Sequence, residues 1–241
     1  MIERFKLGLR NLLLIGSVFG ITSGDPLWTS QVAFAGGTTE LEYRPPGSHQ
    51  IVNHPLSQRD IHAFLKLKAT TLPLYANLFR KHSYKFGIPW QLTAAVSYQE
   101  SHWNPQAQSY TGVRGLMQLT EQTAERVGVE NRRDTEQSVW GGAKYLKMLL
   151  DRQPSNIPFR ERLALALATY NIGPSHMVDA QRLAVSQNKN PYRWSDLQTV
   201  LPLLSQKKYL SLLKHGPARG SEPVLFVHRV LAYLDLFTVQ I

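Results

Sequence analysis

The segment at residues 159–171, FRERLALALATYN, most constrains how this chain can fold. Its apolar residues surround nearly the whole helical circumference, whereas a surface helix carries a single apolar stripe. A helix of this kind has to be buried on all sides, so other helices must pack around it. Gly173 and Pro174 end it, because a helix rarely continues through such a pair. We therefore expect residues 159–171 to form the central helix of an all-α domain.

Helical periodicity continues through most of the chain from Ser57 onward. Residues 57–60 and residues 134–137 have the spacing of N-terminal capping boxes, and Ser175 is placed to cap the helix after Pro174. We find no alternating strand pattern of useful length. The sequence therefore predicts further helices from Ser57, from about Pro73, from about Pro89, and over residues 120–127, 135–151, 195–204, 206–214 and 223–238.

The N-terminal residues have the composition of a secretory signal peptide. Arg4, Lys6 and Arg10 precede a mostly apolar run at residues 12–21, about half the roughly 20 residues that a membrane-spanning helix needs. Ala33-Phe34-Ala35 offers a cleavage site, and a buried core helix is the alternative interpretation. Residues 36–56 are rich in Gly, Pro, Ser and Asn. The sequence predicts a signal peptide at 1–35, a flexible lead-in at 36–56, a domain at 57–241, and export to the periplasm.

The charge and the missing residue types limit the classes of function. Lys and Arg number 27 against 17 acidic residues, which gives a net charge of +10. This charge implies an acidic partner: nucleic acid, an anionic membrane surface, or an anionic polymer such as peptidoglycan. The absence of cysteine excludes disulfides, thiolate zinc sites and thiol catalysis. The eight histidines lack metal-ligand spacing, and the phosphate-binding, dinucleotide-binding and zinc-protease motifs are absent, so we expect no metal and no cofactor.

A polar cluster at residues 98–120, YQESHWNPQAQSYTGVRGLMQLT, contains the strongest catalytic candidate, Glu100. Glu100 lies one helical turn after Val96 and two after Thr93, on the inward edge of a helix. A lone carboxylate at the end of a half-buried helix loses hydration, so its pKa should rise. A carboxylic acid that stays protonated near neutral pH can protonate a glycosidic oxygen. The alternative is a structural glutamate that pairs with Arg114 or caps a loop.

Three blocks in order resemble a known family. They are Glu100 to Pro105 with Gly115-Leu116-Met117-Gln118, then Gly142-Ala143-Lys144-Tyr145-Leu146, then Ala168-Thr169-Tyr170-Asn171-Ile172-Gly173-Pro174. This arrangement resembles lytic transglycosylases with a soluble-transglycosylase (SLT) domain and, within them, the membrane-bound transglycosylase F group. The motif core spans residues 84–220. Thr169 stands where the family usually has Ala, and Arg229 where the F group has Asn.

The resemblance implies an all-α, lysozyme-like fold and a site with one catalytic carboxylate. In the family pattern, Glu100 is the acid and base, and the groove is lined by Ser109, Met117, Gln118, Tyr170 and Asn171. The implied reaction cleaves the β-1,4 bond between N-acetylmuramic acid and N-acetylglucosamine and closes a 1,6-anhydro ring without consuming water. We expect Glu222 to have a structural role, as a partner of Arg219 or as a cap, with a place in the groove as the alternative. We expect the other acids between Glu100 and Tyr170 to face solvent: Glu121, Glu125, Glu130, Asp134, Glu136, Asp151 and Glu161.

Two other functions remain open at this point. A hydrolytic lysozyme-like muramidase would share the fold, and a non-catalytic peptidoglycan-binding component of a secretion apparatus would share the charge. We expect peptidoglycan glycan strands as the partner, no nucleic acid, peripheral association with a membrane such as the outer membrane, and a monomer.

Overall fold

The computed structural model describes residues 55–110 and 112–237, and helices are the regular secondary structure that it forms there. The predicted signal peptide and most of the lead-in lie outside the described residues. Within them, two isolated bridges, Gln108–Arg114 and Arg114–Leu119, are the only β-type pairings, so the all-α prediction is confirmed. In chain order the elements are α1 (Gln58–Thr70), α2 (Leu72–Lys85), α3 (Trp90–Ser101), α4 (Glu121–Val127), α5 (Thr135–Asp151), α6 (Phe159–Ile172), α7 (Pro174–Ser186), α8 (Trp194–Val200), the 3-10 helices η2 (Leu201–Ser205) and η3 (Lys207–Leu212), and α9 (Ser221–Leu236).

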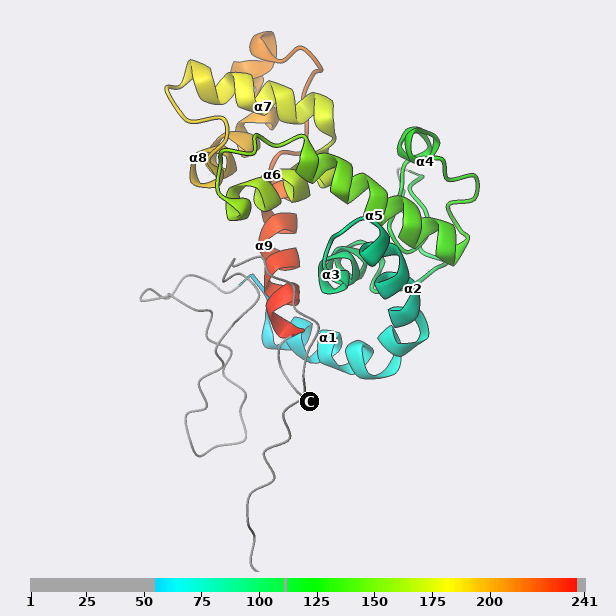
Figure 1. The fold of residues 1–241 in the computed structure, drawn as a ribbon. Coiled ribbons are helices and arrows are strands. Elements are labelled where there is room, and N and C mark those ends of the chain that lie inside the picture. The colour runs from blue at the N-terminus through cyan, green and yellow to red at the C-terminus, as the bar shows by residue number, and fades with distance from the viewer. Residues whose placement is uncertain (1–54, 111, 238–241) are drawn as a thin grey trace, which may run out of the picture.

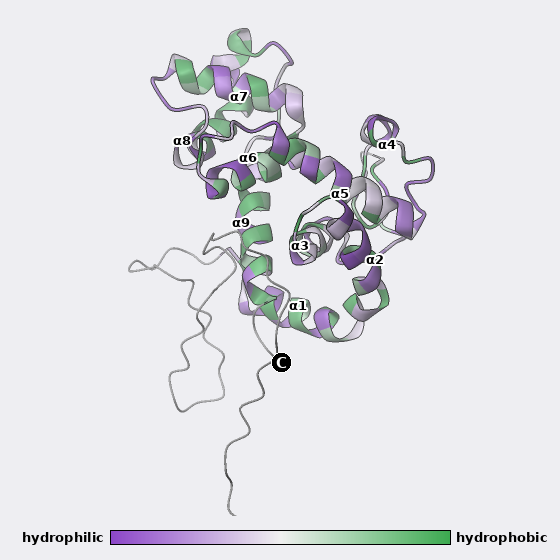
Figure 2. Ribbon diagram, viewed as in Figure 1, coloured by the Kyte–Doolittle hydropathy of each residue, from purple (hydrophilic) through white to green (hydrophobic). Residues whose placement is uncertain are grey.

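Helices α3 and α6 are the two central helices. Residues 163–169 of α6 are all buried, and α6 packs against α5, α7, α8 and α9, as its apolar circumference predicted. Residues 92–98 of α3 are also all buried, and α3 is enclosed by α2, α5 and α9 (Figure 1). The prediction of a buried, central helix at residues 159–171 is therefore confirmed, and α3 is a second central helix that the sequence did not indicate. Helix α9 contacts both central helices, α3 and α6. Figure 2 shows that α9 is hydrophobic along most of its length.

The helix boundaries depart from the sequence prediction after α7. The predicted helix at 195–204 is a short α-helix followed by the 3-10 turn η2, in which Pro202 lies near the start. Proline has no N–H to give to an α-helical bond, which favours the change of geometry. The predicted helix at 206–214 is the 3-10 helix η3, and none of its residues is buried. Ser175 is not a cap, because α7 begins one residue earlier, at Pro174.

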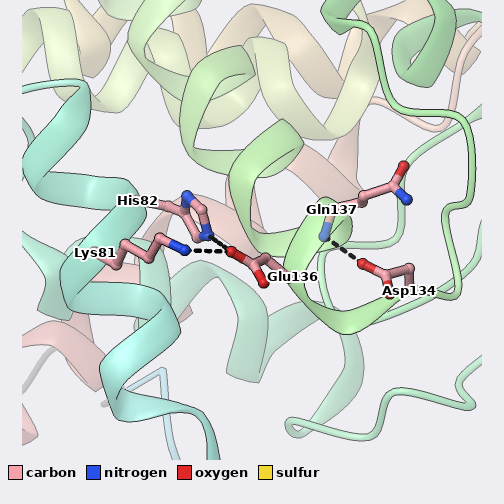
Figure 3. Close-up of polar contacts among 5 residues, drawn as sticks. All are labelled: Lys81, His82, Asp134, Glu136 and Gln137. Atoms are coloured by element: carbon pink, nitrogen blue, oxygen red, sulfur yellow. Dashed lines mark hydrogen bonds and ion pairs between the residues drawn. The ribbon is translucent and has the colours of Figure 1, made fainter.

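A side-chain cap is present at both helix starts for which the sequence predicts a capping box. The Ser57 hydroxyl accepts the N–H of Asp60, and the Asp60 carboxylate accepts the N–H of Ser57 in return, so this capping box is confirmed. At α5 only half of the predicted box forms. The Asp134 carboxylate accepts the Gln137 N–H at 2.7 Å (Figure 3), while the Gln137 side chain turns outward and accepts the N–H groups of residues 130 and 131.

An ion-pair cluster joins α2 to the first turn of α5. The Lys81 ammonium donates to Glu136 Oε1 at 2.6 Å, and Nε2 of the buried His82 lies 3.2 Å from the same oxygen (Figure 3). Burial lowers the pKa of His82, and the Glu136 charge opposes that effect. Glu136 also lies at the positive end of the α5 dipole, where a carboxylate is favoured.

Aromatic side chains tie the two ends of the domain to α3. The Phe64 ring of α1 lies 4.8 Å from Tyr98 of α3 and 5.1 Å from Tyr233 of α9, centroid to centroid. Trp103, just past α3, packs 4.8 Å from Tyr98. All four side chains are almost fully buried. This aromatic cluster therefore fixes the end of α3 that carries Glu100.

Within the described residues, no helix combines the length and apolar character needed to cross a membrane.

Candidate active site

Glu100 lies in the last turn of α3, where the chain reverses sharply. Helix α3 ends at Ser101, and His102 and Trp103 follow with φ of 51° and 58°. Left-handed backbone is unfavourable for residues other than glycine and concentrates at functional sites. The buried Trp103 indole holds the reversal in place, because its Nε1–H donates to the Ala94 carbonyl at 2.9 Å. The position of Glu100 is thus set by packing on both sides of it.

The Glu100 carboxyl is surrounded by protein but has no partner among the described residues. Part of the residue remains accessible to solvent, yet no hydrogen bond or ion pair from its carboxyl forms in residues 55–110 and 112–237, Arg114 included. Burial raises its pKa to about 8. The C-terminal end of a helix also disfavours a negative charge. Glu100 is therefore a protonated carboxylic acid at neutral pH, and the alternative of a glutamate paired with Arg114 is not what the structure shows.

The loop after α3 is anchored to α3 through one carbonyl. The hydroxyls of Ser97 and Ser101 both donate to the Leu116 carbonyl, at 3.0 and 2.9 Å. On the other side, Ser138 of α5 accepts the Met117 N–H at 3.1 Å. These bonds place residues 116 and 117 beside the end of α3 that carries Glu100.

Tyr170 completes the arrangement from the end of α6. Its hydroxyl donates to the Met117 carbonyl at 2.9 Å, and its ring stacks on Phe226 of α9 with a centroid distance of 6.3 Å. Burial raises the pKa of Tyr170 well above its usual value, and the nearby Glu100 charge raises it further. Tyr170 therefore stays a hydrogen-bond donor, and the structure brings Glu100, Met117 and Tyr170 together from three segments.

The other predicted groove residues are used in different ways. The Met117 side chain is fully buried, and a Cβ at Gly142 would come within 2.5 Å of its Cε, so Gly142 is needed for this close packing. The Gln118 side chain is also buried, and its Nε2 donates to the carbonyls of Ala107 and Gly115 at 3.0 and 2.8 Å. Ser109 is half-buried and Asn171 is exposed at the end of α6. Contact of these side chains with a substrate stays a prediction.

The acidic residues differ from expectation at one position. Of the acids expected to face solvent, Glu161 is half-buried, and its carboxylate accepts the N–H of Trp194 at the start of α8. The expected pair of Glu222 and Arg219 is confirmed, at 3.0 Å. The fully buried Asp179 lies on α7 and binds the backbone at residues 214 and 215. No other carboxylate contributes to the raised pKa of Glu100.

Sequence reasoning missed two residues that support this arrangement. Ser138 holds the Met117 N–H, and Phe226 backs the Tyr170 ring. Both are ordinary residues on helix faces, and neither has a local sequence signal.

Two surface hollows also lie away from Glu100. One, of about 310 Å³, is on α7, and one, of about 400 Å³, is lined by residues of α1, α2 and α3 and by Phe237.

Replacing Glu100 with Gln should change how stability depends on pH. The folded state holds the Glu100 proton up to about pH 8, whereas the unfolded chain releases it near pH 4.5. The free energy of unfolding of the wild type therefore falls as the pH rises from 4.5 to 8. The stability that the Glu100 proton contributes is fully present below pH 4.5 and is lost above pH 8. We expect Glu100→Gln to gain about 3 to 5 kcal/mol relative to the wild type across this window.

Urea unfolding at pH 4.5, 6 and 8 measures this difference. Glu125→Gln, which removes an exposed carboxylate from α4, is the matched control and should show no comparable slope. A wild type and a Glu100→Gln variant whose stabilities run parallel across the window would show that Glu100 is ionised in the folded protein.

Comparison with known proteins identifies relatives over the same residues. Residues 77–193 match a family model described as the transglycosylase SLT domain. The chain is 49% identical over 176 residues to a protein of Shewanella sp. (strain W3-18-1) and 50% identical over 176 residues to one of Shewanella pealeana, both named membrane-bound lytic murein transglycosylase F. Each alignment covers 73% of this chain and 36% of the relative, so the chain spans about a third of the length of these relatives.

Two solved structures resemble parts of the chain. One is a lytic transglycosylase Slt from Pseudomonas aeruginosa, at 19% identity and a TM-score of 0.49, with 68% of this chain and 24% of that chain covered. The other is the 70 kDa soluble lytic transglycosylase from Escherichia coli, at 22% identity and a TM-score of 0.45, with 74% and 29% covered.

Proposed function

We propose that this chain, which belongs to the transglycosylase SLT domain family through residues 77–193, is a peptidoglycan lytic transglycosylase. The observation that carries the proposal is the half-buried Glu100 carboxyl, which has no partner in the described residues and is protonated at neutral pH because desolvation raises its pKa to about 8. The relatives named lytic murein transglycosylases support peptidoglycan as the substrate.

In the first half of the proposed reaction, Glu100 acts as the acid. Its proton passes to the glycosidic oxygen of the β-1,4 bond between N-acetylmuramic acid and N-acetylglucosamine. The N-acetyl carbonyl oxygen of the muramic acid attacks C1 as that bond breaks, and the N-acetylglucosamine end leaves as an alcohol. A single protein carboxyl suffices, because the substrate supplies the nucleophile. This is consistent with the lack of any second carboxylate among the causes of the raised Glu100 pKa.

In the second half, Glu100 acts as the base. Its carboxylate, in surroundings that disfavour the charge, takes the proton of the muramic acid C6 hydroxyl. The C6 oxygen then attacks C1, the bond from C1 to the acetamido oxygen breaks, and a 1,6-anhydro ring closes. Glu100 regains the proton that it gave away, and no water is consumed. Tyr170, which stays protonated, and the backbone at Met117 that it binds would border the reacting sugar.

The masses of the reaction products test this function. Purified peptidoglycan is digested with the full chain, and the soluble fragments are weighed. We expect anhydromuramic ends, each lighter by one water than the product of hydrolysis. Products that carry the extra water would identify a muramidase, and an absence of soluble fragments despite binding to sacculi would identify a binding protein. Either result would overturn the proposal.

We propose the periplasm as the place where the chain acts. The substrate lies there, and the relatives are named membrane-bound, which supports a location at the cell envelope. The basic flank and apolar run at residues 1–35 also favour export.

Removing the Tyr170 hydroxyl should slow cleavage through the loop that carries Met117. Tyr170→Phe leaves the ring packed but deletes the bond to the Met117 carbonyl. We expect a loss of about 1 to 2 kcal/mol in the free energy of unfolding and a fall of about tenfold in kcat, since the loop beside Glu100 is no longer fixed. Turbidity loss of peptidoglycan and urea unfolding measure the two effects.

Tyr145→Phe is the matched control for Tyr170→Phe. Tyr145 is a buried tyrosine of α5 whose ring lies 5.4 Å from that of Tyr170, and its hydroxyl makes no bond to the Met117 loop. It should lose a similar amount of stability with kcat within about twofold of the wild type. Equal kcat values for the two variants would contradict a positioning role for Tyr170.

A further inference from the structure

The lobe formed by α7, α8, η2 and η3 is strongly cationic. From the start of α7 to residue 215 the sequence has six Lys and Arg residues and two acids, Asp179 and Asp196, of which Asp179 is fully buried. Three of the lysines, Lys207, Lys208 and Lys214, lie on or beside η3. All three are exposed, and none of them forms an ion pair within the part of the chain that the structure describes. Their charge is therefore available to an external partner.

Exposed leucines lie between these lysines. Leu210 is 39% exposed and Leu212 is 55% exposed, although both are large apolar side chains. Residues three apart eclipse each other in a 3-10 helix, so Lys207 stands on the same edge as Leu210. In Figure 1 the orange segment that includes η3 lies at the outer end of the lobe, beside α7, and Figure 2 shows hydrophobic colour there. We call this surface, made of Lys207, Lys208, Leu210, Leu212 and Lys214, the lysine–leucine edge.

The lysine–leucine edge is held rigidly by what lies beneath it. Leu213 is buried, and the fully buried Asp179 of α7 accepts the N–H groups of Lys214 and His215 at 3.2 and 2.8 Å. The same carboxylate lies 3.2 Å from Nδ1 of His215. Leu210 and Leu212 are therefore exposed on a segment that is anchored to α7. Their exposure is not the result of a loosely packed loop.

We propose that the lysine–leucine edge docks this protein on the surface of a bilayer that contains anionic lipid. Cations beside exposed apolar side chains match such a surface, because the lysines meet lipid phosphates while the leucines enter the acyl boundary. A glycan strand would satisfy the lysines but would leave Leu210 and Leu212 without an apolar partner. The edge belongs to the α7–α8 lobe, whereas Glu100 lies at the end of α3, so the edge contains none of the candidate site residues. The inference is independent of the proposed function.

A fluorescent probe on the edge tests the docking directly. The chain has no cysteine, so Ser211→Cys gives one labelling position on η3 in the full chain. Tyr84→Cys, at an 89% exposed position of α2, gives the control position. Each is labelled with an environment-sensitive dye and mixed with vesicles of phosphatidylglycerol and phosphatidylethanolamine, with phosphatidylcholine vesicles, and with sacculi. Because the probe reports its own surroundings, binding through the N-terminal residues does not imitate the result.

We expect a blue shift and brightening at position 211 with the anionic vesicles only, and none at position 84. In the labelled chain, Lys207→Gln/Lys208→Gln/Lys214→Gln should weaken the response on the order of tenfold or more, and so should high salt. Arg59→Gln/Lys66→Gln/Lys85→Gln removes the same charge from α1 and α2 and should change it less than threefold. Leu210→Ser/Leu212→Ser should abolish the blue shift.

Three results would overturn the proposal: no response at position 211 with anionic vesicles, an equal response with sacculi, or equal losses in the two triple variants. Because the vesicles contain no peptidoglycan, none of these results depends on whether the chain cleaves glycans.

Discussion

Glu100→Gln should lower the rate of peptidoglycan cleavage by on the order of 10² to 10⁴. Glutamine keeps the shape of the side chain, but it can neither give a proton to the glycosidic oxygen nor take one from the C6 hydroxyl. The wild-type rate should also fall above about pH 8, where the buried carboxyl loses its proton. Release of soluble fragments from sacculi, followed from pH 5 to 10, measures both effects.

Binding distinguishes loss of chemistry from loss of the site. The Glu100→Gln variant should still sediment with sacculi, since no other side chain changes, and Glu125→Gln on α4 should cleave at the wild-type rate. If Glu100→Gln still releases fragments at the wild-type rate, Glu100 is not the acid, and the mechanism proposed above is wrong.

Gly115→Ala should produce the largest loss of stability among the substitutions considered. Gly115 has φ of 78°, and a Cβ there would overlap the Arg132 carbonyl oxygen and lie 2.9 Å from the Ser138 hydroxyl. Strained backbone and a clash with another backbone segment together should remove about 3 to 5 kcal/mol from the free energy of unfolding. The Gly115 carbonyl also accepts Gln118 Nε2, so cleavage should weaken in the molecules that still fold. Urea unfolding and activity per folded molecule measure the two losses.

Gly87→Ala separates the clash from the backbone strain. Gly87 has a similar φ, 62°, but nothing lies within 4 Å of a Cβ built there. Gly87→Ala should lower the free energy of unfolding by only about 1 to 2 kcal/mol. Similar losses at the two glycines would mean that the close approach of Arg132 does not constrain the loop.

The sequence predicts those parts of the molecule that depend on short stretches of chain. The burial of α6 follows from its apolar circumference, and the capping box at Ser57 follows from two residues three apart. The raised pKa of Glu100 follows from its place at the end of an enclosed helix. Each of these features depends on neighbours within a few residues, which a periodicity or a motif can reveal.

The sequence does not predict contacts between distant segments. The bond from Tyr170 to Met117 spans 53 positions, and the match between Gly142 and the Met117 side chain depends on how α5 meets the loop. The 3-10 geometry of residues 207–212 was also missed, because its apolar residues have helical spacing although none of them enters the core. How distant segments pack against one another, which no local pattern encodes, decides each of these cases.

The aromatic cluster has a consequence for the order in which the domain matures. Phe64 and Tyr233 come from the first and last helices of the described residues, and both rings pack against Tyr98, two residues before Glu100. Contacts between such distant positions form late, because a long loop must close first. We therefore expect α3, and with it Glu100, to reach its final packing only after α9 has docked. Hydrogen exchange of α3 amides during refolding, which should slow only together with that of α9, would reveal this sequence of events.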